Sequence, residues 1–405
     1  MNLRHRCWAE IDLNALRENL AWLRNRVGAQ VKILTVVKAD AYGHGLKQIA
    51  ALLMQSGTDV FGVANLAEAR AVRHVGQGWP ILMLGACLPE EIESAVQDSV
   101  MPTISTVEEA RRYSEIAKRL HKTVDVHAKV DTGMGRLGAP IRDAVAFIQG
   151  ILQLDGLRLR GLYTHYASAE DDGGFTRLQR VRFQRLVKAL RRDGLCPSLI
   201  HASNSAGILH EPHSDFGLVR PGLLVYGIVP QGSRGLQPAL LLSRKGGFPT
   251  AHSIGGRKAA APGSGTIGFR PALSWHCRVS LIKVVPTGAS LSYGRTFVAR
   301  KKMRVATLTA GYGDGYLRAG SNRAEVLIGG HRCRVLGRIT MDQMLADVSL
   351  VSNGQSGDEA VLIGRQGEEQ ITAHDVAEWC GTVAWEVLTN ISYRVLRIYR
   401  GAHAA

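Results

Sequence analysis

The chain has 405 residues, of which 45% are hydrophobic and 21% charged, a composition typical of a globular protein large enough for two domains. Fifty Lys and Arg against 34 Asp and Glu leave a net charge of +16, a balance also found in proteins that bind nucleic acid or anionic membranes. The basic residues are scattered and their densest runs are short, so we interpret them as solvated surface and expect no nucleic-acid or membrane partner. No apolar stretch approaches the ~20 residues of a membrane span, and six widely spaced cysteines indicate neither a zinc site nor a disulfide framework. We therefore expect a cytoplasmic protein without a bound metal.

In chain order, the first predicted elements are a strand at residues 6–11 and a helix that Asp12 caps. A short β-branched run then ends at Lys38 and leads into a Gly-rich turn, as a buried parallel strand would. A lysine at this point either reaches solvent or is desolvated. Desolvation lowers the pKa of a lysine, and the neutral amine can form a Schiff base with a carbonyl compound. This stretch alone leaves both alternatives open.

Strand-like and helix-like patterns alternate from the first helix to about residue 220. Eight strand–helix repeats in this length predict an α/β fold of the (β/α)8 barrel type, which we assign to residues 12–232. Barrel enzymes carry their chemistry at the C-terminal ends of the strands, and polar residues follow several of the predicted strands there. The predicted strands are 31–37, 60–64, 80–85, 100–104, 123–130, 157–164, 198–202 and 217–220.

Residues 233–268 are rich in Gly, Pro and basic residues, so they predict a flexible insertion or linker. From 269 to 405, short alternating strands and turns predict a mostly β domain, which the strand at 6–11 is expected to join. Gly329-Gly330 fits a two-residue hairpin turn, and residues 373–380 predict one helix.

The predicted rim of the barrel combines two chemical features. The loops after the last two strands of such barrels often bind phosphate through backbone N–H groups. Asn204, Ser205, Gly222 and Leu223 lie in those loops. A Schiff-base lysine together with a phosphate cradle indicates pyridoxal 5'-phosphate (PLP).

Two stretches, VKADAYGHG at 37–45 and KVDTGMGRLG at 129–138, resemble the signature motifs of the alanine racemase family. Further matches cover nearly the whole chain outside 233–268. The resemblance implies a homodimer that uses PLP to interconvert L- and D-alanine by a two-base mechanism, supplying D-alanine for peptidoglycan. A serine or broad-spectrum amino-acid racemase of the same fold is the alternative. A PLP carrier built on the barrel alone is disfavoured, because a carrier needs neither the β domain nor a second base.

The resemblance also implies the roles of the catalytic residues. Lys38 would carry PLP and act as a base on one face of the substrate Cα, and Tyr293 of the partner subunit would act on the other face. His165 would bond to that tyrosine with Arg220 beyond it, and nearby cations lower a tyrosine pKa. Arg220 would also face the pyridine nitrogen. Lys129 matches a lysine that many family members carry as a carbamate, which would orient Arg136.

The remaining site residues are implied to hold the cofactor and the substrate. Arg136 would reach the phenolic oxygen of PLP and the substrate carboxylate. Met341 of the partner subunit would meet that carboxylate through its backbone N–H, and Tyr312 would line the substrate entrance. The residues implied to bind PLP are Lys38, Tyr42, Arg136, His165, Asn204, Ser205, Arg220, Gly222, Leu223 and Tyr393.

Overall fold

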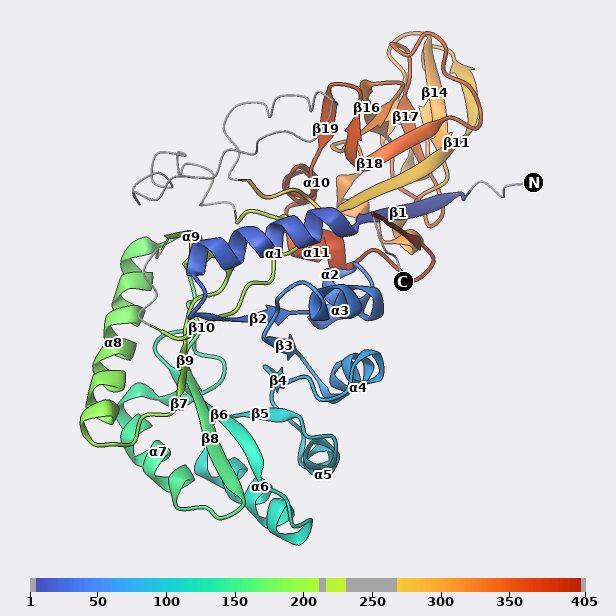
Figure 1. The fold of residues 1–405 in the computed structure, drawn as a ribbon. Coiled ribbons are helices and arrows are strands. Elements are labelled where there is room, and N and C mark those ends of the chain that lie inside the picture. Colours follow the sequence, from blue (N-terminus) through green and yellow to red (C-terminus); the bar gives the residue numbers. More distant parts are fainter. Residues whose placement is uncertain (1–4, 211–215, 231–267, 402–405) are drawn as a thin grey trace, which may run out of the picture.

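The computed structural model describes residues 5–210, 216–230 and 268–401. Its N-terminal part is a closed barrel of eight parallel strands, in which the last strand pairs again with the first (Figure 1). The predicted (β/α)8 barrel is thereby confirmed. The strands are β2 (Lys32–Val36), β3 (Val60–Val63), β4 (Ile81–Met83), β5 (Met101–Ile104), β6 (Val124–Asp131), β8 (Leu157–Tyr163), β9 (Leu199–His201) and β10 (Leu218–Val219), with β7 (Ala139–Pro140) beside β6.

Amphipathic helices surround the barrel and bury their apolar faces on the sheet, and all of them except α1, which leads from β1 into β2, lie between successive parallel strands. They are α1 (Leu13–Val27), α3 (Leu46–Met54), α4 (Leu66–Val75), α5 (Ile92–Gln97), α6 (Val107–Arg119), α7 (Ala144–Leu152), α8 (Gly173–Arg192) and α9 (Ser205–His210), and a single turn, α2 (Lys38–Tyr42), follows β2. Within the described ranges, no helix is long and apolar enough to cross a membrane.

The C-terminal part is mostly β, as predicted. Six of its strands close into an antiparallel ring in the order β11-β14-β17-β16-β15-β18, because β18 pairs with both β15 and β11. These strands are β11 (Leu273–Val285), β14 (Met303–Leu308), β15 (Glu325–Ile328), β16 (His331–Leu336), β17 (Met344–Asp347) and β18 (Glu359–Gln366). Smaller elements are β12 (Ser290–Leu291), β13 (Phe297–Val298), β19 (Glu369–Ile371), α10 (Ala373–Cys380), α11 (Ala384–Thr389) and β20 (Leu396–Arg400).

Local sequence signals of this part are confirmed in detail. Gly329 and Gly330, with φ of 59° and 78°, form the two-residue turn between β15 and β16. Positive φ at both turn positions explains why glycine occupies them. The helix predicted at 373–380 is α10, whereas α11, with six residues, is too short to show a helical period and was not predicted.

The chain crosses between the two parts at Asp12. Strand β1 (Cys7–Asp12) pairs antiparallel with β11 and parallel with β20 in the C-terminal sheet. The Asp12 carboxylate then accepts the N–H groups of Asn14 and Ala15, at 2.9 and 3.0 Å, and so starts helix α1 of the barrel. The domain limits 12–232 and 269–405 stay predictions, and the insertion at 233–268 lies, apart from Gly268, outside the described residues.

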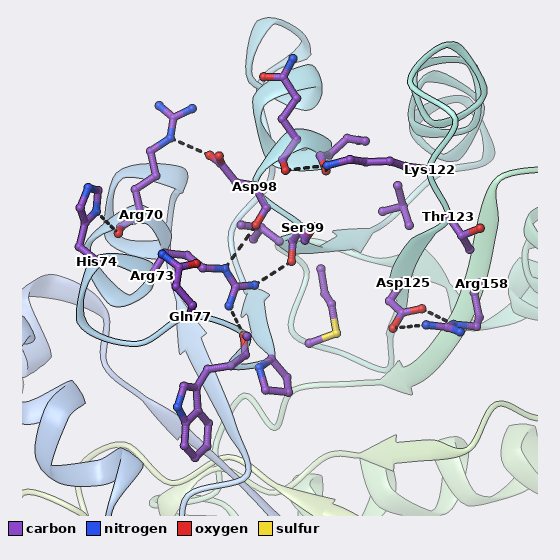
Figure 2. Close-up of a pocket in the computed structure, with 18 residues that line it drawn as sticks. Arg70, Arg73, His74, Gln77, Asp98, Ser99, Lys122, Thr123, Asp125 and Arg158 are labelled. Carbon is purple, nitrogen blue, oxygen red and sulfur yellow. Dashed lines mark hydrogen bonds and ion pairs between the residues drawn. The ribbon is translucent and has the colours of Figure 1, made fainter.

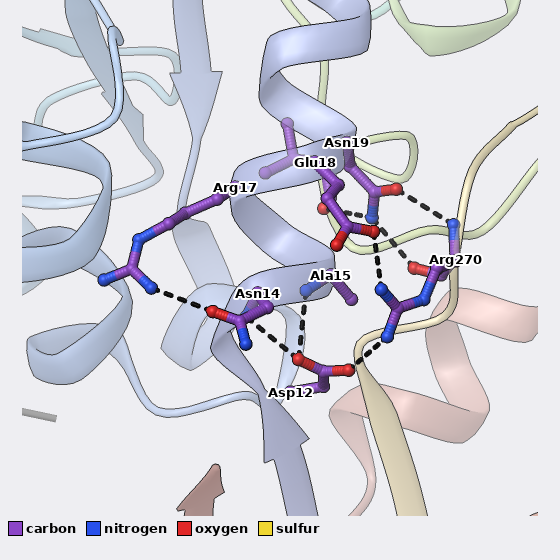
Figure 3. A network of polar contacts seen from close by, with 8 residues as sticks. Asp12, Asn14, Ala15, Arg17, Glu18, Asn19 and Arg270 are labelled. Atoms are coloured by element: carbon purple, nitrogen blue, oxygen red, sulfur yellow. Dashed lines mark hydrogen bonds and ion pairs between the residues drawn. The ribbon is translucent and has the colours of Figure 1, made fainter. Parts of the chain in front are cut away.

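Helix α1 also binds the chain on both sides of that undescribed stretch (Figure 3). The fully buried Asn19 amide donates to the carbonyls of Val225 and Arg270, at 3.1 and 2.8 Å, and accepts the Arg270 N–H at 2.9 Å. The Arg270 guanidinium forms ion pairs with Asp12 at 2.6 Å and Glu18 at 2.5 Å. One helix face therefore joins the end of the barrel to the start of the β domain.

Replacing Asn19 tests this junction. In Asn19→Leu three backbone groups lose their buried partner, and each unsatisfied group costs about 1–3 kcal/mol. We expect the free energy of unfolding to fall by at least that amount in urea denaturation. The control is Asn14→Ala on the exposed side of the same helix, for which we expect less than about 0.5 kcal/mol. Equal losses in the two variants would contradict the role of Asn19.

Candidate active site

Cavities lie at both ends of the barrel, and their charges distinguish them. The cavity at the N-terminal strand ends has about 790 Å³ and basic walls (Figure 2). Its cations already have partners: Arg70 pairs with Asp98, Arg158 with Asp125, and Lys122 donates to two backbone carbonyls. The Arg73 guanidinium likewise donates to the carbonyls of Trp79, Asp98 and Ser99. A ligand here would compete with existing bonds, so we assign no function to this cavity.

The cavity at the C-terminal strand ends has about 520 Å³ and is lined by ten of the fourteen predicted site residues. They come from the ends of five strands and the loops that follow, which the closed barrel brings to one rim. The ten are Lys38, Tyr42, Lys129, Arg136, His165, Asn204, Ser205, Arg220, Gly222 and Leu223.

Lys38 reaches the cavity through an unusual turn. The four residues after it, 39–42, have φ of 53–54° although none is glycine. A left-handed conformation costs roughly 1–2 kcal/mol for each such residue, so the surroundings must hold it. Glu68 accepts the Ala39 N–H at 2.7 Å, and Asp40 accepts the Leu46 N–H at 2.7 Å. The sequence predicted a turn from its glycines but gave no sign of this conformation.

The sequence left open whether Lys38 reaches solvent or is desolvated, and its surroundings favour desolvation. The side chain is half-buried, and burial followed by the positive charge of Arg136 lowers its pKa. A lowered pKa increases the fraction of neutral amine, which is the nucleophilic form.

A buried guanidinium fixes the protonation of two histidines. Arg220 is 3% exposed and donates to Nδ1 of His201 at 2.7 Å and to Nδ1 of His165 at 3.1 Å. Because a guanidinium can only donate, both histidines accept at Nδ1 and carry their proton on Nε2. Burial and the charge of Arg220 hold the pKa of both imidazoles well below the usual range. His165 is therefore a neutral ring with an Nε2–H donor.

Lys129 lies in the same positive field. It is buried, and its Nζ lies 5.5 Å from the centre of the Tyr163 ring, over which Arg220 also lies at 5.0 Å. Burial, then Arg136 and Arg220, lower the pKa of Lys129 to about 8. Part of this lysine is therefore neutral near physiological pH.

The opposite wall of the cavity is a backbone cradle. The Ser205 hydroxyl accepts the N–H groups of Gly222 at 3.0 Å and of Leu224 at 3.3 Å. A Cβ at position 222 would lie 2.6 Å from the Tyr42 hydroxyl, so only glycine allows this approach. Asn204 accepts the Gly207 N–H at 2.9 Å and so fixes the same loop. These bonds hold the loop around Ser205 and Gly222 at the cavity wall, and glycine-containing loops of this kind are a common setting for an anion such as a phosphate.

The other four predicted residues do not line this cavity. Tyr293, Tyr312, Met341 and Tyr393 lie on loops of the β domain and are 71%, 43%, 53% and 96% exposed. Exposed large apolar side chains often mark interaction surfaces. Within one chain, the structure thus brings together the ten predicted barrel residues. The role of Tyr393 in binding the phosphate stays a prediction.

Sequence reasoning missed several residues that shape the site. His201 lies three residues before Asn204 in the sequence, but no local sequence signal assigned it a role. His201 stacks on Tyr163 with ring centres 4.6 Å apart and bonds on to His127 at 2.9 Å. Glu68 carries no local signal, because its two bonds to the Lys38 turn and to Ala64 exist only in the folded barrel.

The fold and this rim define a barrel protein with a reactive lysine, a buried arginine and an anion cradle, joined to a β domain. The family model described as "Alanine racemase, N-terminal domain" matches residues 11–230, and "Alanine racemase, C-terminal domain" matches residues 272–399. The chain belongs to the alanine racemase family.

Individual relatives extend this similarity over the full length. An alanine racemase of Carboxydothermus hydrogenoformans is 40% identical over 393 residues, covering 97% of this chain and 99% of the relative. The solved alanine racemase of D-cycloserine-producing Streptomyces lavendulae is 30% identical with a TM-score of 0.86, covering 99% of each chain. A Bartonella henselae alanine racemase solved with covalently bound pyridoxal phosphate is 25% identical with a TM-score of 0.82, covering 98% of this chain and all of that one.

The lowered pKa of Lys129 predicts a pH-dependent stability. Its pKa is about 8 in the fold and roughly 10.4 in the unfolded chain, so between these values the unfolded chain binds more protons. The free energy of unfolding should therefore rise with pH across this window, by up to about 3 kcal/mol from this group. In urea denaturation in CO2-free buffers, Lys129→Met should be more stable than the wild type at pH 7 and lose that advantage toward pH 10.

The matched control is Lys47→Met, because Lys47 is exposed on α3. This variant should follow the wild type at every pH. Parallel stability curves for Lys129→Met and the wild type would show that Lys129 titrates alike in the folded and unfolded states.

Proposed function

We propose that this chain is a PLP-dependent alanine racemase that interconverts L- and D-alanine by a two-base mechanism and supplies D-alanine for peptidoglycan. The observation that carries the proposal is the shared cavity of Lys38, Arg220 and the Gly222–Ser205 cradle in a chain of the alanine racemase family. A cytoplasmic location stays a prediction from the sequence.

The residues of the cavity fit PLP at both of its ends. The amine of Lys38 would bond the aldehyde carbon, and the Gly222 cradle with Ser205, Tyr42 and the backbone of Leu223 would hold the phosphate. Arg220 would meet the pyridine nitrogen. Because a guanidinium accepts no proton and repels one, it would keep that nitrogen unprotonated.

When bound, PLP withdraws electrons from the substrate Cα and makes its proton acidic. The substrate amine would take the place of Lys38 on the aldehyde carbon, and the freed amine of Lys38, whose pKa burial lowers, would take or return that proton at Nζ on one face. Arg136 would orient the substrate carboxylate. Neutral Lys129 can react with CO2 to form a carbamate, which would turn a competing cation into an anion that holds Arg136.

Racemisation requires a second acid or base on the face of the substrate Cα opposite to Lys38. We infer that Tyr293 of the partner subunit supplies it, since Tyr293 of the same chain is 71% exposed and away from the cavity. The Nε2–H of neutral His165 would donate to that phenolate and stabilise it, with Arg220 behind. Met341 and Tyr312 of the partner subunit would close the substrate side. The proposal therefore includes a homodimer with shared sites.

The function is tested by D-alanine formation from L-alanine with added PLP. Lys38→Ala should lose the adduct that borohydride traps and lower the rate by about 10²–10⁴-fold or more. Lys47→Ala, a substitution of an exposed lysine, should keep the trapped adduct and the wild-type rate. An adduct on another lysine would contradict the assignment. Small pockets reject an added hydroxyl poorly, so some turnover of L-serine is expected. A higher kcat/KM for L-serine than for L-alanine would favour the serine or broad-spectrum alternative.

The shared site is tested by mixing two inactive proteins, Lys38→Ala and Tyr293→Phe. In a mixed dimer one site carries both defects, whereas the other combines an intact Lys38 with an intact Tyr293 from the opposite chain. We expect activity of about half the wild-type value per mixed dimer, since a twofold dimer has two equivalent sites. No recovery, with subunit exchange shown by mass spectrometry of tagged chains, would contradict the shared site.

A further inference from the structure

The turn that presents Lys38 is bound by one side chain from the far end of the sequence. Arg397 lies on β20, and its Nε donates to the carbonyl of Gly43 at 3.1 Å. Its Nη1 donates to Ser392 at 2.5 Å and to Val395 at 2.7 Å, and its Nη2 donates to Ile391 at 2.6 Å. A single guanidinium thus joins the end of the Lys38 turn to the β-domain loop 391–395.

The same end of the turn has no free space on the β-domain side. A Cβ at Gly43 would lie 2.3 Å from the Leu388 carbonyl oxygen, and one at Gly45 would lie 1.9 Å from the Tyr399 hydroxyl. The Tyr399 hydroxyl donates to the His44 carbonyl at 3.1 Å. Strand β20 therefore contacts the turn at two successive inward-reaching positions, 397 and 399.

The turn needs such support, because four successive residues other than glycine are left-handed in it. A conformation of this kind persists only where several contacts determine it together. Glu68 and Asp40 hold the peptide groups at positions 39 and 46. The carbonyl of Gly43, between those two, is bonded by Arg397.

We propose that Arg397 is a positioning residue for Lys38: by bonding the Gly43 carbonyl it keeps the left-handed turn in the conformation that directs Lys38 into the cavity. The inference rests on the proposed function for its catalytic consequence only. Lysine at this position would preserve the charge but could not reach carbonyls from two segments in one plane, because its donors sit on a single nitrogen.

The loop at the other end of this link is itself fixed. The Ser392 N–H donates to the Asp314 carbonyl, and the Ser392 hydroxyl to the Gly313 carbonyl, both at 3.0 Å. Arg394 forms ion pairs with Asp314 at 3.3 Å and with Asp342 at 2.7 Å. Arg397 therefore anchors the turn to a cross-linked group of loops rather than to a single free segment.

The test compares Arg397→Met and Arg397→Lys with Arg400→Met in the full chain. Arg400 is a matched control, because it lies on the same strand, is exposed and pairs only with Glu10 among the described contacts. In hydrogen exchange without PLP, the amides of residues 39–46 should exchange about tenfold faster in both Arg397 variants, as expected when a hydrogen bond from a charged donor is lost. The Arg400→Met chain should exchange like the wild type.

With PLP present, the Arg397 variants should form the borohydride-trapped Lys38 adduct more slowly, and kcat should fall more than KM for alanine rises. Wild-type exchange in residues 39–46 of a folded Arg397→Met chain would overturn the proposal. If circular dichroism shows that Arg397→Met does not fold, the exchange of residues 39–46 is measured in Tyr399→Phe and Arg397→Lys instead. Unchanged exchange in both variants overturns the proposal. A wild-type protein without racemase activity would refute the proposed function, whereas the exchange measurement would still test Arg397.

Discussion

The buried charge of Arg220 acts on Lys129, His165 and His201 at the rim of the barrel. Burying a guanidinium is costly, and here two imidazoles, two backbone carbonyls and the face of Tyr163 compensate it. Among the described residues no carboxylate pairs with Arg220, so its positive charge acts on its neighbours. Burial, followed by the charges of Arg136 and Arg220, lowers the pKa of Lys129, and burial followed by the charge of Arg220 lowers the pKa of both histidines. The bonds from Arg220 also fix the histidine protons on Nε2. A buried arginine without a carboxylate partner suits a site for a cofactor and a substrate that both carry negative charge.

The two ends of the barrel show how the same residue types acquire different roles. At the N-terminal end, two arginines form ion pairs with aspartates, and a lysine donates to two backbone carbonyls. At the C-terminal end, Lys38 and Lys129 form no ion pair among the described contacts. Burial lowers the pKa of both lysines and so favours their neutral forms. The presence of basic residues alone therefore does not distinguish the two cavities. They differ in whether the basic side chains form ion pairs with carboxylates.

The β domain contributes to this rim from a distance. Strands β1 and β20, the first and last described strands, lie side by side at the edge of its sheet. From this edge Arg397 and Tyr399 contact the turn, while Asp12 starts the first helix of the barrel. The Lys38 turn is thus contacted from both the barrel and the β domain.

The sequence by itself determined the barrel, the β domain and most of the cavity, because alternating strand and helix patterns fix which strand ends share a rim. It also placed Lys38, Arg220 and the Gly222 cradle there, since each follows directly on a strand. Only the tertiary structure decided how these groups are tuned. The left-handed turn after Lys38, the support from Glu68 and Arg397, and the His201–Arg220–His165 chain join residues far apart in sequence. Such contacts leave no local periodicity, and desolvation, which sets the pKa values, exists only once the barrel has closed.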